Sequence, residues 1–179
     1  MSTPRWLPAA VCAAILTLAA CGGAQSDPAN GGQPLPTPQQ STSTAVDGTI
    51  ALLRDRLAGR GYQMFPPIAP YRPSEPASFT QAPRTVFQVS GADADQGYVV
   101  IYSFPTDAAA SAAGTELASY MASGFGQTNF PLDAQFSVSQ VGSTIVFTWY
   151  SGARASDPAA ARGAFDAIAA VGQPFRVVK

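Results

Sequence analysis

The chain has 179 residues, with ten basic and eleven acidic side chains, a net charge of −1 and no histidine. A chain so nearly neutral lacks the basic surface of a nucleic-acid-binding domain, so we expect no nucleic-acid partner. The missing histidine excludes Ser-His-Asp and Cys-His catalysis and the commonest zinc ligands, since imidazole is the usual base and metal ligand near neutral pH.

The first twenty residues have the parts of an export signal. A polar start with one positive charge, Arg5, precedes an almost unbroken apolar run over residues 7–18. This run is shorter than the about 20 apolar residues that span a bilayer, and small residues follow it, as in a cleaved leader. Leu18-Ala19-Ala20-Cys21 then resembles the lipobox of bacterial lipoproteins. The alternatives are a plain signal peptide with an incidental cysteine, or an uncleaved anchor.

The lipobox resemblance implies that residues 1–20 are removed and that the sulfur of Cys21 carries a diacylglycerol. Two or more acyl chains give a lasting hold on a membrane, at about 0.8 kcal/mol per buried CH₂. We therefore expect an extracytoplasmic protein whose membrane contact is a lipid anchor. Cys12 leaves with the leader, so the mature chain has no cysteine free for a disulfide and needs a hydrophobic core for its stability.

Residues 21–45 form the next part, the modified cysteine and a segment of Gly, Pro, Gln, Ser and Thr. Such a composition buries too little apolar surface to offset the entropy of ordering, so we predict a disordered tether. A flexible coil of this length has an r.m.s. span of roughly 25–30 Å.

Residues 46–179 are long enough for one domain. It opens with a predicted helix that Asp47 can cap, in which Ile50, Leu53 and Leu57 share one face and Gly61 is the stop signal. Residues 62–83 contain six prolines. Because proline lacks a backbone donor, we predict an irregular connection here, with a short strand at residues 62–65.

Two strand–strand–helix units follow. In each, a short alternating stretch precedes a longer strand rich in β-branched and aromatic residues, and a capped helix comes after it. The predicted strands cover residues 87–90, 98–104, 136–139 and 144–150, with a tight turn at Gly142-Ser143. Thr106 or Asp107 caps the first helix, which ends at Gly124, and Asp157-Pro158 opens the second, which ends at Gly172.

The predicted fold class is α+β: one helix, then two strand–strand–helix units, with a four-stranded, mainly antiparallel sheet and helices on one face. We place Val99, Ile101 and Phe147 on the covered face. Residues such as Tyr102 and Tyr150 make the other face apolar too, although an antiparallel sheet usually leaves one face polar. Either the first helix and the proline-rich segment cover that face, or it binds a ligand.

Leu53-Arg54, the stretch from Leu57 to Tyr62 and the strand IVFTWY (residues 145–150) give most of residues 46–175 a pattern that is similar to small bacterial envelope lipoproteins without assigned activity. The resemblance implies the architecture and no site.

Aromatic and cationic side chains supply one candidate binding surface, because Tyr, Trp and Arg are favoured at binding centres. The alternative is that these aromatics are ordinary core. We expect no metal or cofactor: Asp93-Ala94-Asp95-Gln96-Gly97 departs from the calcium-loop pattern and is better explained as a solvated hairpin. The candidate surface consists of Tyr71, Arg84, Tyr102, Trp149 and Tyr150.

These features predict a membrane-anchored lipoprotein that is not an enzyme and that serves as a binding or envelope-structural module. Its partner would be an envelope protein, a peptide or a cell-wall component. The first alternative is a hydrolase that acts on envelope glycan with paired Asp and Glu carboxylates. The second is a small-molecule carrier, which needs a cavity of a few hundred Å³.

Overall fold

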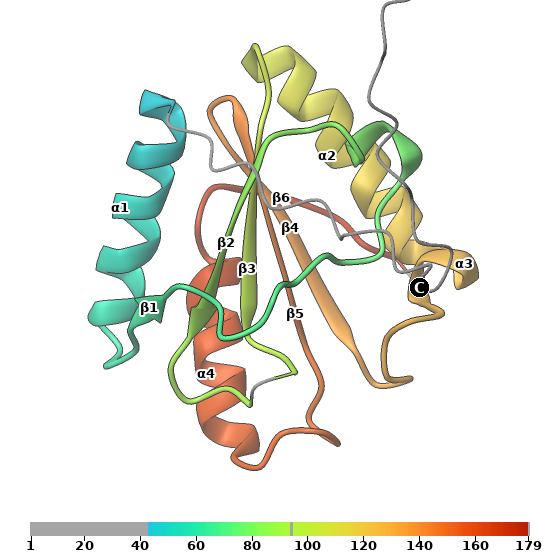
Figure 1. Ribbon diagram of the computed structural model, residues 1–179. Coiled ribbons are helices and arrows are strands. Elements are labelled where there is room, and N and C mark those ends of the chain that lie inside the picture. The colour runs from blue at the N-terminus through green and yellow to red at the C-terminus, as the bar shows by residue number, and fades with distance from the viewer. Residues whose placement is uncertain (1–42, 94, 179) are drawn as a thin grey trace, which may run out of the picture. The chain divides into compact units, whose positions relative to one another are not determined.

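A six-stranded antiparallel sheet forms the centre of the computed structural model, in the order β1-β2-β3-β5-β4-β6 (Figure 1). The structure describes residues 43–93 and 95–178. The predicted export signal, Cys21 and most of the predicted tether lie outside these residues. The strands are β1 (Met64–Phe65), β2 (Arg84–Val89), β3 (Tyr98–Ser103), β4 (Gln135–Val141), β5 (Thr144–Tyr150) and β6 (Gln173–Phe175). The helices are α1 (Thr44–Ala58), α2 (Asp107–Ala122), α3 (Gly124–Gln127) and α4 (Pro158–Ala169), and η1 (Ala77–Phe79) is a 3₁₀ turn.

The α+β class and the two strand–strand–helix units are confirmed, but the prediction of four strands is wrong. The four expected strands form the centre of the sheet, and the short strands β1 and β6 extend its edges. The missed strand, β6, follows Gly172, whose φ of +75° turns the chain back after α4. Its second residue, Pro174, pairs opposite Ser139 of β4. Proline is tolerated there because an edge strand needs donors on one side only.

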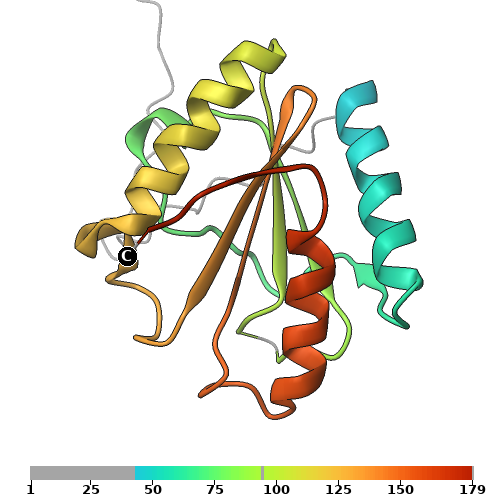
Figure 2. The ribbon, with the colours of Figure 1, turned by 180° about the vertical axis from the view of Figure 1, so that it is seen from behind.

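Helices cover both faces of the sheet, so the prediction of one covered face is wrong. α1 and α4 lie on one side of the sheet and α2 on the other (Figure 1), and the view from behind agrees (Figure 2). Val99 and Ile101 pack with Val146 against α1 and α4. Phe147 packs instead on the α2 side, because it pairs with Val100 and not with its neighbours.

Local hydrogen-bonding signals place the helix starts. The side chain of Ser43, not Asp47, caps α1 by accepting from the backbone N–H of Val46. Of the two predicted caps of α2, Thr106 is the one used; the cap of α4 is Asp157, as predicted, and it accepts from two backbone N–H groups. α2 ends at Ala122, two residues before the predicted stop.

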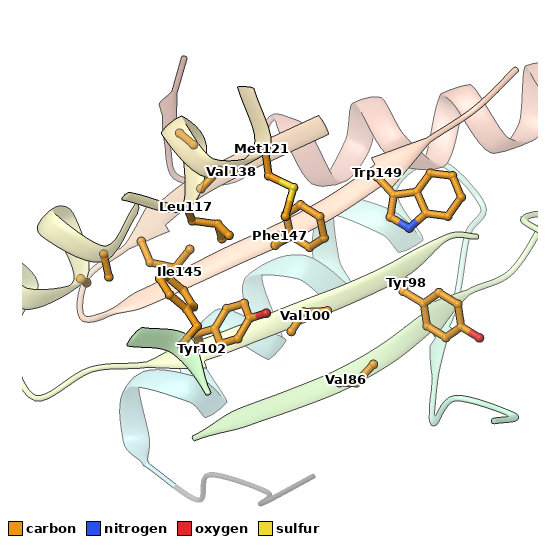
Figure 3. Close-up of a cluster of buried hydrophobic side chains, with 14 of the residues drawn as sticks. Val86, Tyr98, Val100, Tyr102, Leu117, Met121, Val138, Ile145, Phe147 and Trp149 are labelled. Carbon is orange, nitrogen blue, oxygen red and sulfur yellow. The ribbon is translucent and has the colours of Figure 1, made fainter. Parts of the chain in front are cut away.

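The core on the α2 side contains larger side chains than the core on the other side. Leu117 and Met121 of α2 lie above Phe147 and Ile145 in the middle of the sheet (Figure 3). Tyr98 and Trp149 lie further along β3 and β5, away from these helix residues (Figure 3). That end of the face therefore needs a second cover. Among the described residues, no helix is both long enough and apolar enough to cross a membrane.

Gly114 allows α2 to approach β6 closely. A Cβ atom there would lie 2.3 Å from the ring of Phe175 and 2.9 Å from Ile145. We expect Gly114→Ala to cost about 1–3 kcal/mol of unfolding free energy, because the packed ring has to move. Gly48→Ala in α1 is the matched control, since a Cβ atom added there would have no other atom within 4 Å. It should stabilise by about 0.5–1 kcal/mol. Urea unfolding of both variants measures the change in unfolding free energy. Equal changes in the two variants would contradict the close approach of α2 and β6.

Candidate functional site

A segment without regular secondary structure supplies the second cover of the α2-side face. Residues 66–76, here called the cover segment, contain five prolines. Their single backbone–backbone hydrogen bond within the described chain is accepted by Pro76 from the N–H of Phe79. The following turn, η1, is anchored by Phe79, which is buried edge-on against Tyr102. Side chains, and not a backbone ladder, therefore hold the cover segment on the sheet.

The carboxylate of Glu75 makes the first of these contacts. Nη1 of Arg84 donates to both of its oxygens at 2.8 Å, and the hydroxyl of Tyr102 donates to one of them at 2.8 Å. Arg72, from the cover segment itself, adds a contact of 2.6 Å. The Glu75 and Arg84 side chains are only 4% and 9% exposed. The sheet thus presents a cation and a phenol to a single buried carboxylate.

The buried guanidinium of Arg84 is costly without this carboxylate. Charges removed from water lose several kcal/mol of solvation, which an ion pair recovers only through close contacts and further hydrogen bonds. Tyr102 can supply such a bond because burial, first, and the adjacent Glu75 charge raise its pKa well above the usual value, so that it keeps its proton. The Arg84 guanidinium also lies over the Tyr102 ring.

Tyr71 makes the second contact. Its ring stacks on that of Tyr98, with centroids 3.8 Å apart and planes 3° from parallel. Nε1 of Trp149 donates to its hydroxyl oxygen at 3.0 Å. Burial is the main cause that raises the pKa of Tyr71, so its hydroxyl stays neutral near pH 7. A third contact joins the hydroxyls of Ser74 and Tyr120 at 2.9 Å.

The structure brings four of the five residues of the predicted binding surface together. They lie beneath the cover segment and not on an exposed surface. Tyr71, Arg84, Tyr102 and Trp149 meet between the cover segment and the sheet, where they are buried or half-buried. Tyr150 lies in a separate cluster with Phe165, and the guanidinium of Arg162 lies over its ring.

Glu75 is not among the binding residues predicted from the sequence. The available signal was its position, since Glu75 is the single acidic residue of the proline-rich stretch and lies between Pro73 and Pro76. Both prolines are buried. An acid between two buried residues needs a cation nearby, and sequence alone does not show that Arg84 supplies it.

Two aspartates organise the loops at the end of the sheet where β3 begins and β5 ends, which is the end that carries Tyr98 and Trp149. Asp93 accepts from the backbone and hydroxyl of Ser156 and from Gln96. Asp133 accepts from the hydroxyl of Ser151 at 2.7 Å and from the backbone of Ala153 at 2.9 Å. These hydrogen bonds, led by those from Ser156 and from Ala153 respectively, lower the pKa of each carboxyl below its usual value. Asp93 thus tethers the predicted hairpin loop to the start of α4.

The cavity that adjoins the Asp93 loop is small. An enclosed cavity between β5 and α4, beside Trp149 and Phe165, has a volume of about 10 Å³. This is the space of roughly one water molecule, so this cavity is too small for the ligand of a carrier. A wider hollow of about 420 Å³ lies on the outer side of α1 and is open to solvent; it is lined by Leu52, Asp55, Arg56, Gly59 and Arg60. Within residues 43–93 and 95–178, no three His, Cys, Asp or Glu side chains gather as metal ligands would.

Comparison with known proteins does not place the chain in a family. No protein-family model matches it, and neither the curated proteins nor the solved structures contain a significant match.

We expect Glu75→Gln to destabilise the domain by about 3 kcal/mol, because it leaves the buried Arg84 without its counter-charge. Adding Arg84→Met should recover part of this loss, since the unpaired charge is then gone. The control is Asp166→Asn, whose ion pair with Arg162 is about half exposed and should contribute less than about 1 kcal/mol. Urea unfolding at neutral pH measures all three variants. Equal losses from Glu75→Gln and Asp166→Asn would contradict the expectation.

The lowered pKa values of Asp93 and Asp133 predict how the free energy of unfolding depends on pH. Their folded-state pKa values lie below the unfolded value of 3.8. Their contribution is therefore complete above about pH 4 and is lost as the pH falls through the folded-state pKa values. Asp93→Asn combined with Asp133→Asn should be less stable at pH 7 and should lose less stability on acidification. Urea midpoints between about pH 7 and pH 2.5 measure this, with Asp55→Asn on the exposed face of α1 as control.

Proposed function

We propose that the protein is an extracytoplasmic lipoprotein, anchored to a bacterial membrane through a lipid on Cys21, whose domain is a binding module without catalytic activity. The observation that carries the proposal is Leu18-Ala19-Ala20-Cys21 directly after a short apolar run with a positive charge before it. The thiolate is the nucleophile that forms a thioether to lipid, and the small residues before it are those of a cleavage site.

The composition after Cys21 supports a module held at a distance from the lipid surface. The residues from Gly22 to the start of α1 are mostly small or polar. A chain of this kind reaches roughly 25–30 Å. Such a reach lets the domain search for a partner near the membrane without inserting into it.

The buried contact between the cover segment and the sheet supports a binding role. Arg84 and Tyr102 hold a carboxylate, and Tyr98 and Trp149 hold an aromatic ring. Arg, Tyr and Trp are the side chains that dominate protein recognition sites. Envelope proteins, peptides and cell-wall components all present carboxylates, so each is a candidate partner.

No observation favours the hydrolase alternative. Its two possible glutamates are both engaged in hydrogen bonds: Glu75 accepts from Arg72, Arg84 and Tyr102, and Glu116 accepts from Ser78 at 2.7 Å. A carboxylate that acts as a general acid needs a proton and an open approach to substrate. We therefore propose the binding role alone.

Metabolic labelling with a fatty acid tests the anchor. The full chain expressed in a bacterial host should incorporate label and fractionate with membranes, because the acyl chains bury many CH₂ groups in lipid. Cys21→Ser should lose the label, keep the leader and appear larger on a denaturing gel.

Cys12→Ser is the matched control. It changes the other cysteine, inside the apolar run, and should leave labelling and fractionation unchanged. An unlabelled wild-type chain, or a Cys21→Ser chain with unchanged label, would overturn the proposed anchor.

A further inference from the structure

Beneath the cover segment, three adjacent strands of the sheet present the polar and aromatic side chains that hold this segment in place. The receiving groups belong to three adjacent strands: Arg84 to β2, Tyr98 and Tyr102 to β3, and Trp149 to β5. Sites built on strands are held more rigidly than sites on loops. The occupying groups, Tyr71 and Glu75, belong to a segment without regular structure.

The occupying segment is the part of this interface that can leave. Between Phe65 at the end of β1 and η1, the described chain has one backbone–backbone hydrogen bond, from Phe79 to Pro76. Segments with few backbone hydrogen bonds open at a lower free energy than the core around them. Phe79 remains in the core and its N–H donates to the carbonyl of Pro76, so residues 66–75 can lift while Pro76 and η1 stay in place.

A second feature of the same face is an unused acceptor. Arg84, Val86 and Gln88 alternate along one side of β2, and Gln88 pairs opposite Tyr98. The side chain of Gln88 is buried, its Nε2 donates to the carbonyl of Asp93, and its Oε1 has no hydrogen-bond partner among the described residues. A buried acceptor without a donor is unfavourable by about 1–3 kcal/mol. A ligand with an N–H group can satisfy it.

We propose that Arg84, Tyr102, Tyr98 and Trp149 bind an extended peptide of a partner protein, and that the cover segment mimics this peptide and occupies its site. The ligand class follows from the present occupant: an aromatic side chain four residues before a carboxylate, in a chain that tolerates proline. The proposal rests on the binding role proposed above and names its partner class.

The ion pair suits such an exchange. A buried ion pair adds little net stability compared with an apolar contact, whereas leaving Arg84 without an anion is costly. An incoming carboxylate can replace the contacts that Glu75 makes with Arg84 and Tyr102, while a partner without an acid leaves the guanidinium unpaired. The pair therefore selects for acidic ligands. The cover segment has the advantage of being attached, which corresponds to a millimolar or higher local concentration.

The test uses the full-length chain in detergent and a fluorescent peptide with the sequence of residues 66–77. The receptor is Glu75→Gln, which removes the competing carboxylate and keeps the receiving groups. Fluorescence anisotropy should show saturable binding that is at least about tenfold tighter than to the wild-type chain. A peptide with glutamine in place of its glutamate is the matched ligand control. It should bind at least about tenfold more weakly, a difference of about 1.4 kcal/mol.

The receptor control is Glu75→Gln combined with Arg84→Met, which should lose the preference for the acidic peptide. Circular dichroism checks that each variant is folded. If Glu75→Gln does not fold, Tyr71→Ala takes its place with the same peptides, since it loosens the cover segment and leaves the ion pair.

Absence of saturable binding to a folded variant at millimolar peptide, or equal affinity for the acidic and the glutamine peptide, overturns the proposal. Neither result bears on the lipid anchor, which fatty-acid labelling tests separately.

Discussion

Both faces of the central sheet are apolar, and this constraint governs the arrangement of the rest of the chain. Val99, Ile101 and Val146 require a cover on one side, and Val100, Tyr102 and Phe147 require one on the other. With three long helices available, two are used on the first side and one on the second (Figure 2). The α2 side is therefore completed by the cover segment, which is not helical.

The incomplete helical cover explains the character of the buried contacts at that end. A proline-rich segment has few backbone donors and cannot join the sheet as a full strand. Its attachment depends on the side chains of Tyr71, Ser74 and Glu75, each of which meets a polar group on the sheet or on α2. The result is a buried interface in which polar and aromatic groups lie side by side, and aromatic side chains and arginine are the groups enriched at protein interfaces.

The proposed anchor and the proposed site serve a common purpose. A lipid on Cys21 would confine the domain to the neighbourhood of a membrane, and a flexible tether would let it reach partners there. Confinement raises the local concentration of partners, so a modest affinity suffices. A site that its own chain occupies suits this setting, because weak or unsuitable ligands do not displace the attached segment.

The sequence by itself determined the α+β class, the order of the two strand–strand–helix units and the turn at Gly142-Ser143. These depend on local periodicity, capping and turn chemistry. The sequence also contains the lipobox pattern, which remains a prediction. The tertiary structure alone decided that Phe147 and Val99 lie on opposite faces and that β6 pairs with β4 at the edge of the sheet. It also decided that Glu75 meets Arg84 and Tyr102. The physical reason is register: moving a strand by one residue exchanges its faces, and register is set by contacts between residues far apart in the chain.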